Sequence, residues 1–131
     1  MIDAETALPI DPLILLHTVM ALLAIALGMV VLVSRKGTSR HRFMGRIWAG
    51  LMVFVSLTSF GIGETFSIIH ALSIWVIFGM AMAFIGIRHI KGRRGLRIHS
   101  AFMIGNYIGL CGAAVPAFLT EGRLMHALVF G

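Results

Sequence analysis

Four long apolar runs alternate with short polar segments along this chain. The runs cover residues 13–33, 43–62, 66–87 and 101–119. About 20 apolar residues span the hydrocarbon core of a bilayer as a helix, and about 17 can suffice. The second run reaches that length only if it begins near Phe43 and if Arg46 extends its side chain to the lipid headgroups. The pattern therefore predicts an all-α membrane protein with four transmembrane helices.

The second half of the chain repeats the order of features in the first half. Each half has a histidine, an apolar run, a basic Lys-Gly loop and a second histidine, which are His17, Lys36-Gly37 and His41 in one half and His70, Lys91-Gly92 and His99 in the other. A repeat of this size indicates a repeated supersecondary unit, here a two-helix hairpin. Two hairpins with short connections predict an up-down-up-down bundle in which the first and third helices lie across the diagonal. We expect one transmembrane domain over residues 1–131, with an N-terminal segment 1–12 and a tail 120–131 on the outer side of the membrane.

The charges are divided between the two ends of these helices. Ten of the eleven cations lie in two clusters around the loops that follow the first and third runs, and all five acids lie elsewhere. Short loops rich in Lys and Arg remain in the cytoplasm. We therefore expect a multi-pass protein of the bacterial inner membrane, with both termini and the Glu64 turn on the periplasmic side. The predicted anchors for lipid headgroups are Arg35, Lys36, Arg40, Arg42, Arg46, Arg88, Lys91, Arg93, Arg94 and Arg97.

Composition agrees with a membrane protein and excludes several other classes. The chain is 59% hydrophobic and only 12% charged, whereas a soluble domain carries about 25% charged residues. The net charge of +6 does not predict a nucleic-acid partner, because the cations follow the membrane topology. Cys111 is the single cysteine, so no internal disulfide can form. We find no nucleophile motif and no phosphate-binding loop, and we expect no enzyme activity.

Histidines are the residues most able to carry chemistry in this chain. An ionisable group inside a membrane helix is a functional candidate by default. His17 and His70 lie about one turn into the first and third helices, at the same predicted depth. Two such imidazoles could ligate a haem b from opposite sides. The alternative is that both rings only form hydrogen bonds between helices.

His41 and His99 form a second equivalent pair at the cytoplasmic ends of the second and fourth helices. They could hold a second haem, or they could simply face solvent and headgroups. A carboxylate–histidine metal site has no supporting spacing such as His-x-x-x-His. The cofactor is therefore left open between haem b and none.

Small residues recur at helical spacing and predict close helix packing. The longest stripe is Ala101, Gly105, Gly109 and Ala113, and shorter ones include Gly79 with Ala83 and Ala24 with Gly28. The same positions could instead leave clearance for a flat cofactor.

Several segments of the chain resemble a bacterial family of predicted four-helix membrane proteins that is classed as a domain of unknown function. They are Leu16-His17, Lys36-Gly37-Thr38, His41-Arg42-Phe43-Met44-Gly45-Arg46, Ile69-His70 and Arg97-Ile98-His99. The resemblance extends from about Leu13 to Leu119 and implies the four-helix topology. A looser architectural similarity links the chain to b-type four-helix cytochromes, and it is an analogy of fold only.

Three functions follow as hypotheses. The first is an accessory or structural subunit of a larger respiratory or photosynthetic membrane complex, with lipids and other membrane subunits as partners. The second is a b-type haem electron carrier with His17 and His70 as axial ligands. The third is a transporter or channel subunit.

Overall fold

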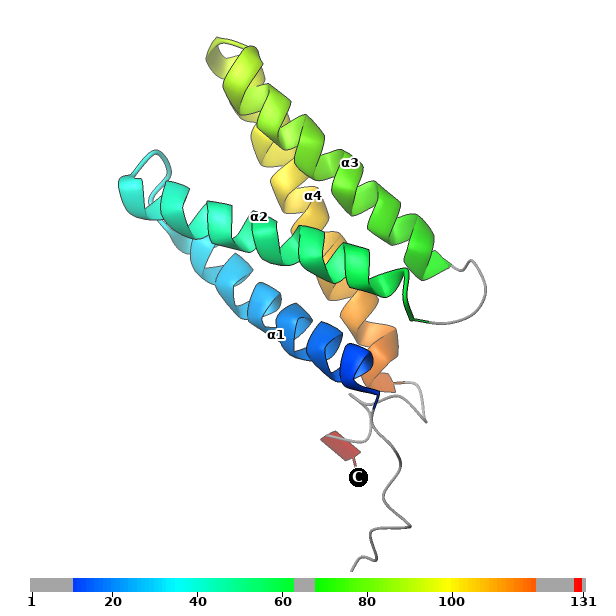
Figure 1. Ribbon diagram of the computed structural model, residues 1–131. Coiled ribbons are helices and arrows are strands. Elements are labelled where there is room, and N and C mark those ends of the chain that lie inside the picture. Colours follow the sequence, from blue (N-terminus) through cyan, green and yellow to red (C-terminus); the bar gives the residue numbers. More distant parts are fainter. Residues whose placement is uncertain (1–10, 63–67, 120–128, 131) are drawn as a thin grey trace, which may run out of the picture.

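The computed structural model describes residues 11–62, 68–119 and 129–130. These residues form four helices and no strand: α1 (Pro12–Val33), α2 (Ser39–Ser59), α3 (Ile68–His89) and α4 (Gly92–Leu119) (Figure 1). The predicted all-α class and the four helices are confirmed within this part of the chain. The turn at Glu64 and most of the segment 120–131 lie outside the described residues.

The helices extend beyond the predicted spans at the basic end. α2 begins at Ser39 rather than near residue 43, and α4 begins at Gly92 rather than near residue 101. Thr38 caps α2 by accepting a hydrogen bond from the backbone nitrogen of His41 at 3.1 Å. An apolar run reports where the hydrocarbon would end, whereas helical hydrogen bonding continues until a cap or a glycine stops it.

Three of the four helices are long and apolar enough to cross a membrane. They are α1, α3 from His70 to His89, and α4 from Gly92 to Pro116. α2 is not among them, although its 21 residues would extend about 31 Å. Its first two turns carry Arg40, Arg42 and Arg46, which lower its mean hydropathy.

The helices are arranged as two neighbouring pairs. α1 packs along α2, and α3 packs most extensively along α4, while the α2–α3 and α1–α4 contacts join the pairs. Among the described residues, the backbones of α1 and α3 do not approach closely, nor do those of α2 and α4, although the ring of Trp48 on α2 contacts that of Tyr107 on α4 with centroids 6.3 Å apart. The two pairs diverge toward their basic loops (Figure 1). The predicted diagonal positions of α1 and α3 agree with these contacts.

Two aromatic side chains join α1 to the centre of the core. The indole Nε1 of Trp48 donates to the carbonyl oxygen of Ala24 at 2.9 Å, and the hydroxyl of Tyr107 donates to that of Ile25 at 3.1 Å. Both rings lie against Gly28. A buried Trp or Tyr contributes a large apolar area once its polar atom has a partner. These contacts fix the rotation of α2 and α4 relative to α1.

The small residues divide into two groups that the sequence does not distinguish. Gly28 and Gly79 are close approaches as predicted, with Asn106 of α4 packed directly on Gly79. The stripe on α4 behaves differently, because no described atom lies within 4 Å of a Cβ at Gly105, Gly109 or Gly112. Within this chain, the prediction that the α4 stripe mediates helix packing is therefore wrong.

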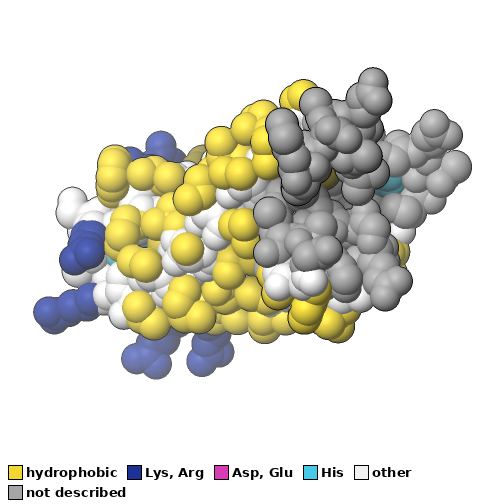
Figure 2. Space-filling model, turned by 90° about the horizontal axis from the view of Figure 1, so that it is seen from below, with side chains coloured by type: hydrophobic (Ala, Val, Ile, Leu, Met, Phe, Trp, Pro, Cys, Tyr) yellow, Lys and Arg dark blue, Asp and Glu magenta, His cyan; other side chains and the backbone are white. Residues whose placement is uncertain are grey.

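The surface separates apolar and charged side chains. Apolar side chains cover the body of the molecule, and Lys and Arg gather at one end (Figure 2). Large hydrophobic side chains are exposed on all four helices, for example Phe43 at 65% and Ile108 at 64%. A soluble monomer rarely exposes such extensive apolar surface, whereas lipid contact requires it.

Candidate functional site

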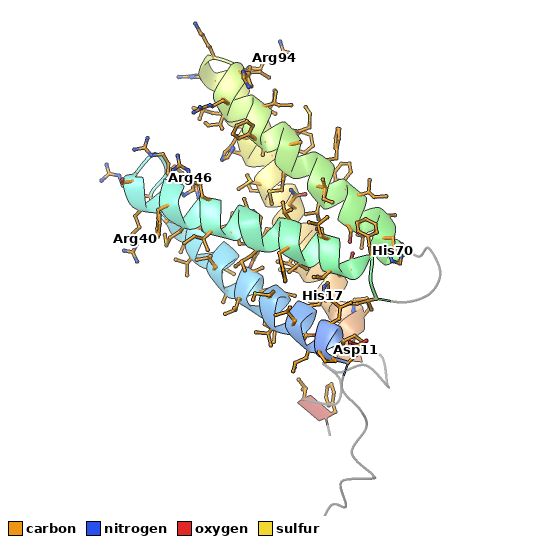
Figure 3. The ribbon with its side chains drawn as sticks, in the orientation of Figure 1. Asp11, His17, Arg40, Arg46, His70 and Arg94 are labelled. Atoms are coloured by element: carbon orange, nitrogen blue, oxygen red, sulfur yellow. The ribbon has the colours of Figure 1, made fainter. Side chains whose placement is uncertain are left out.

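The four repeated histidines lie at two levels of the bundle. His17 and His70 lie at the end opposite the arginines (Figure 3), whereas His41 and His99 belong to the basic half. α2 extends between the two levels, because His41 lies in its first turn and Thr58, which contacts His17, lies in its last turn. The stretch from His41 to Thr58 is about 25 Å long at 1.5 Å per residue.

His17 is held by a hydroxyl from α2. Its Nδ1 lies 2.8 Å from Oγ1 of Thr58. That hydroxyl donates its single proton to the carbonyl oxygens of Phe54 and Val55, at 3.0 and 2.9 Å. A Thr58 oxygen whose proton goes to these carbonyls accepts from Nδ1–H of His17, which corresponds to the Nδ1-protonated tautomer.

His41 is held in the same way by a hydroxyl at the end of α1. Its Nδ1 lies 2.9 Å from Oγ of Ser34, and that hydroxyl donates to the carbonyl oxygen of Val31 at 2.7 Å. A Ser34 hydroxyl that donates to this carbonyl accepts from Nδ1–H of His41, as Thr58 does from His17. His41 precedes the predicted apolar span, and burial lowers its pKa, with further lowering by the Lys36 ammonium and by His99. This lowering favours the neutral imidazole, which is the form that ligates a metal.

His99 is held by a backbone carbonyl of α3. Its Nδ1 lies 3.1 Å from the oxygen of Ala83, which can only accept, so Nδ1 carries the proton. His41 on α2 and His99 on α4 both lie in the basic half of the molecule, at the ends where the two helix pairs diverge (Figure 1). That these two histidines form a ligand pair stays a prediction from the repeat.

His70 has a different environment. It is buried, with only 6% of its surface exposed, and its ring stacks on that of Phe60 with centroids 5.5 Å apart. His17 and His70 therefore each contact the C-terminal end of α2, on Thr58 and Phe60. Helices α1 and α3 do not pack on one another here, which agrees with a diagonal position for the two histidines.

Space beside His41 is available on the same face of α2. Gly45 follows His41 by one turn, and no described atom lies within 4 Å of a Cβ at Gly45. Among the described residues, no three His, Cys, Asp or Glu side chains come together as a bare metal ion would require. Two imidazoles suffice only for a metal whose remaining ligands come with it, as in a porphyrin.

His89 belongs to neither level. His89 is exposed at the end of α3, where its ring lies edge-on to Phe84 with centroids 6.4 Å apart. His126 lies outside the described residues.

The partners of the histidines were not predicted from the sequence. Thr58, Ser34 and the carbonyl of Ala83 orient the rings, yet nothing in their local sequence distinguishes them from other small or polar residues. The signal that was available is the repeat itself, which predicts the histidines but not what they contact.

Comparison with known proteins identifies a family. A family model described as a predicted membrane protein (DUF2306) matches residues 14–129, nearly the whole chain. No curated protein and no solved structure matches the chain. The predicted resemblance to a membrane-protein family of unknown function is confirmed.

Proposed function

We propose that this chain, which belongs to the DUF2306 family of predicted membrane proteins, is a b-type haem electron carrier. One observation carries the proposal. His17, His41 and His99 all use Nδ1, and not Nε2, in their hydrogen bond to a hydroxyl or carbonyl oxygen. Histidines that ligate metals characteristically donate their other ring nitrogen in this manner, which fixes the tautomer and the orientation of the ring.

The proposed membrane arrangement has four spans in up-down-up-down order. Both basic loops lie in the cytoplasm and both termini in the periplasm of a bacterial inner membrane. The gathering of the cations at one end of the molecule supports this orientation (Figure 2). In this arrangement α2 crosses the membrane with its apolar part from Ile47 onward, while Arg40 and Arg42 remain among the headgroups.

Each level would have its own pair of histidine ligands. His41 and His99 would form the cytoplasmic level, and His17 and His70 the periplasmic level. A bound haem b supplies a one-electron couple at each level, tuned by its two imidazole ligands. Ser34, Thr58 and the Ala83 carbonyl hold the rings, and the open space at Gly45 admits a flat group beside His41.

An optical spectrum tests the proposal. The protein is purified in mild detergent from cells that make haem, and its dithionite-reduced minus oxidised spectrum is recorded. We expect a b-type absorption band that decreases in His41→Ala and His99→Ala, and in His17→Ala and His70→Ala. The exposed His89 offers a matched control, since His89→Ala removes a histidine of the same basic region but of neither level. A colourless protein, or equal loss in the control, would contradict the proposal.

A second function is favoured by the outward face of α4. Gly105, Gly109 and Gly112 form an open stripe of small residues, beside which Ile108 is 64% exposed. Small residues on a lipid-facing stripe allow close approach of another transmembrane helix. This supports a role as an accessory subunit of a larger membrane complex. Purification in mild detergent should then recover a partner in fixed stoichiometry that Gly109→Leu removes. A protein that always migrates alone would count against this role.

A further inference from the structure

The two basic loops are built differently, although the sequence repeats their charge. Helices α3 and α4 are joined by only Ile90 and Lys91, and their backbones touch. A methyl group at Gly95 would overlap the backbone oxygens of Ile90 and Gly86. Helices α1 and α2 are joined by the five residues 34–38, with Gly37 in the left-handed conformation at φ 81°. The longer loop leaves room that the shorter loop does not.

A cavity of about 370 Å³ occupies the α1–α2 end. Val30, Val33 and Met44 form its apolar wall, and Arg35 and Arg40 lie on its rim with the hydroxyl-bearing residues Ser34 and Thr38. We call it the loop cavity. It therefore combines an apolar surface with two guanidinium groups in one place.

The guanidinium groups of the loop cavity have no carboxylate partner in the described part of the chain. Asp11 is the single acid there, and it lies at the opposite end of the molecule (Figure 3). Lys36 is already engaged, because its Nζ donates to the carbonyl oxygens of Leu32 and Val31 at 2.7 and 3.1 Å. Lys36 thus caps α1, while Arg35 and Arg40 are left to bind an anion.

We propose that the loop cavity binds the phosphate headgroup of one anionic phospholipid. Arg35 and Arg40 would donate hydrogen bonds to the phosphate oxygens, as planar guanidinium groups do well. Val30, Val33 and Met44 would contact the glycerol and the first methylenes of the acyl chains. The apolar wall favours a lipid over a free phosphate ion, which would leave that wall without a partner. The proposal does not depend on haem.

Lipid binding at the loop cavity must be distinguished from the general attraction of surface cations to anionic lipid. The second basic cluster provides the matched control. The double variant Arg35→Gln/Arg40→Gln removes two cations from the loop cavity. Arg93→Gln/Arg94→Gln removes two exposed cations from the compact loop. Surface attraction depends on net charge and falls equally in both. A built site is lost only in the first.

The experiment titrates the full-length protein in detergent with phosphatidylglycerol or phosphatidylcholine and counts bound lipids by native mass spectrometry. We expect one phosphatidylglycerol to bind tightly, and about tenfold more weakly or worse once the two charge-assisted contacts of Arg35 and Arg40 are gone. The Arg93/Arg94 variant should bind like the unmodified chain. Met44→Trp, which fills the cavity and keeps every charge, should also displace the lipid.

Three outcomes would overturn the proposal. Equal weakening in the two arginine variants would indicate surface charge alone. Equally tight binding of phosphatidylcholine would remove the role of the anionic headgroup. Displacement of the lipid by inorganic phosphate at the same concentration would assign the site to the free ion. Helix content by circular dichroism verifies that every variant is folded, and Met44→Trp tests the cavity without altering the loop charges.

Discussion

Adding one methyl group at Gly28 should destabilise the helix bundle markedly. A Cβ at Gly28 would lie 2.6 Å from Nε1 of Trp48 and 2.6 Å from the ring of Tyr107. Neither ring can simply turn away, because each is tied to α1 by a hydrogen bond to the carbonyl of Ala24 or Ile25. Gly28→Ala must therefore either displace α1 or break at least one of these hydrogen bonds.

The magnitude follows from three contributions. Overpacking in a well-packed core costs about 1–3 kcal/mol. Losing one hydrogen bond adds about 0.5–1.5 kcal/mol. Replacing Gly by Ala within a helix returns about 1 kcal/mol through helix propensity. The sum predicts that Gly28→Ala lowers the free energy of unfolding by about 0.5–3.5 kcal/mol.

The matched control is Gly105→Ala, at a position where no described atom lies within 4 Å of the new Cβ. Here only helix propensity acts, so stability should stay equal or rise by up to about 1 kcal/mol. Unfolding is measured by circular dichroism during titration of the detergent-solubilised protein with sodium dodecyl sulfate. In a Trp75→Phe background, fluorescence of Trp48 reports on the same core contact. Equal stability of the two variants would refute the packing that places both rings on Gly28.

Three further predictions concern topology, ionisation and a buried amide. In a Cys111→Ser background, single cysteines at Lys36 and Lys91 should react only from the cytoplasmic side and one at Glu64 only from the periplasmic side; any other pattern would reverse the proposed orientation. The NMR titration midpoint of His41 should lie below the ordinary 6.5, because burial and Lys36 lower its pKa. The stability that His41 contributes is then fully present above pH 6.5 and is lost as the pH falls through the folded-state pKa. A midpoint above 6.5 would contradict this sign. Asn106→Leu should leave the free energy of unfolding unchanged within about 1 kcal/mol or raise it. Oδ1 of Asn106 has no hydrogen-bond partner among the described residues, and the bond from its Nδ2 to the carbonyl oxygen of Val76 is long at 3.4 Å. A loss of several kcal/mol in the same unfolding titration would show that the amide is needed.

The helices could be predicted from the sequence because hydropathy is a local property. Each apolar run appears as a helix, and the charge clusters predict which ends lie together. The first residues of α2 and α4 were harder to predict, since α2 begins at a Thr38 cap and α4 begins directly after the tight turn at Lys91. A hydropathy window averages over such single-residue features.

The candidate site could be predicted only in part. The repeat predicts that His41 and His99 share a level, but their partners come from other elements, such as the Ala83 carbonyl on α3. Such contacts depend on the rotation and axial register of packed helices, which sequence spacing within one helix does not determine. The α4 stripe illustrates the same limit. Small residues at every fourth position predict that another helix approaches closely, but they do not indicate whether that helix belongs to this chain or to another.

The differences between the two repeats separate two kinds of chemistry. The histidines recur at equivalent positions in the two halves of the sequence. His41 near the start of α2 and His99 in the N-terminal part of α4 both have Nδ1 in a hydrogen bond, with Ser34 in one half and with the Ala83 carbonyl in the other. A site that needs one ligand from each half is served by this symmetry, since neither hairpin alone can supply both imidazoles. The loop cavity lies in the first half, whereas in the second half the backbones of α3 and α4 touch at Gly95. Variants of Arg35 and Arg40 should therefore weaken lipid binding without altering the spectrum of the proposed haem, and variants of the histidines should do the reverse. If substitutions at Arg35 and Arg40 abolished both properties together, the two sites would be one, and the division of the repeat into a shared and an unshared function would fail.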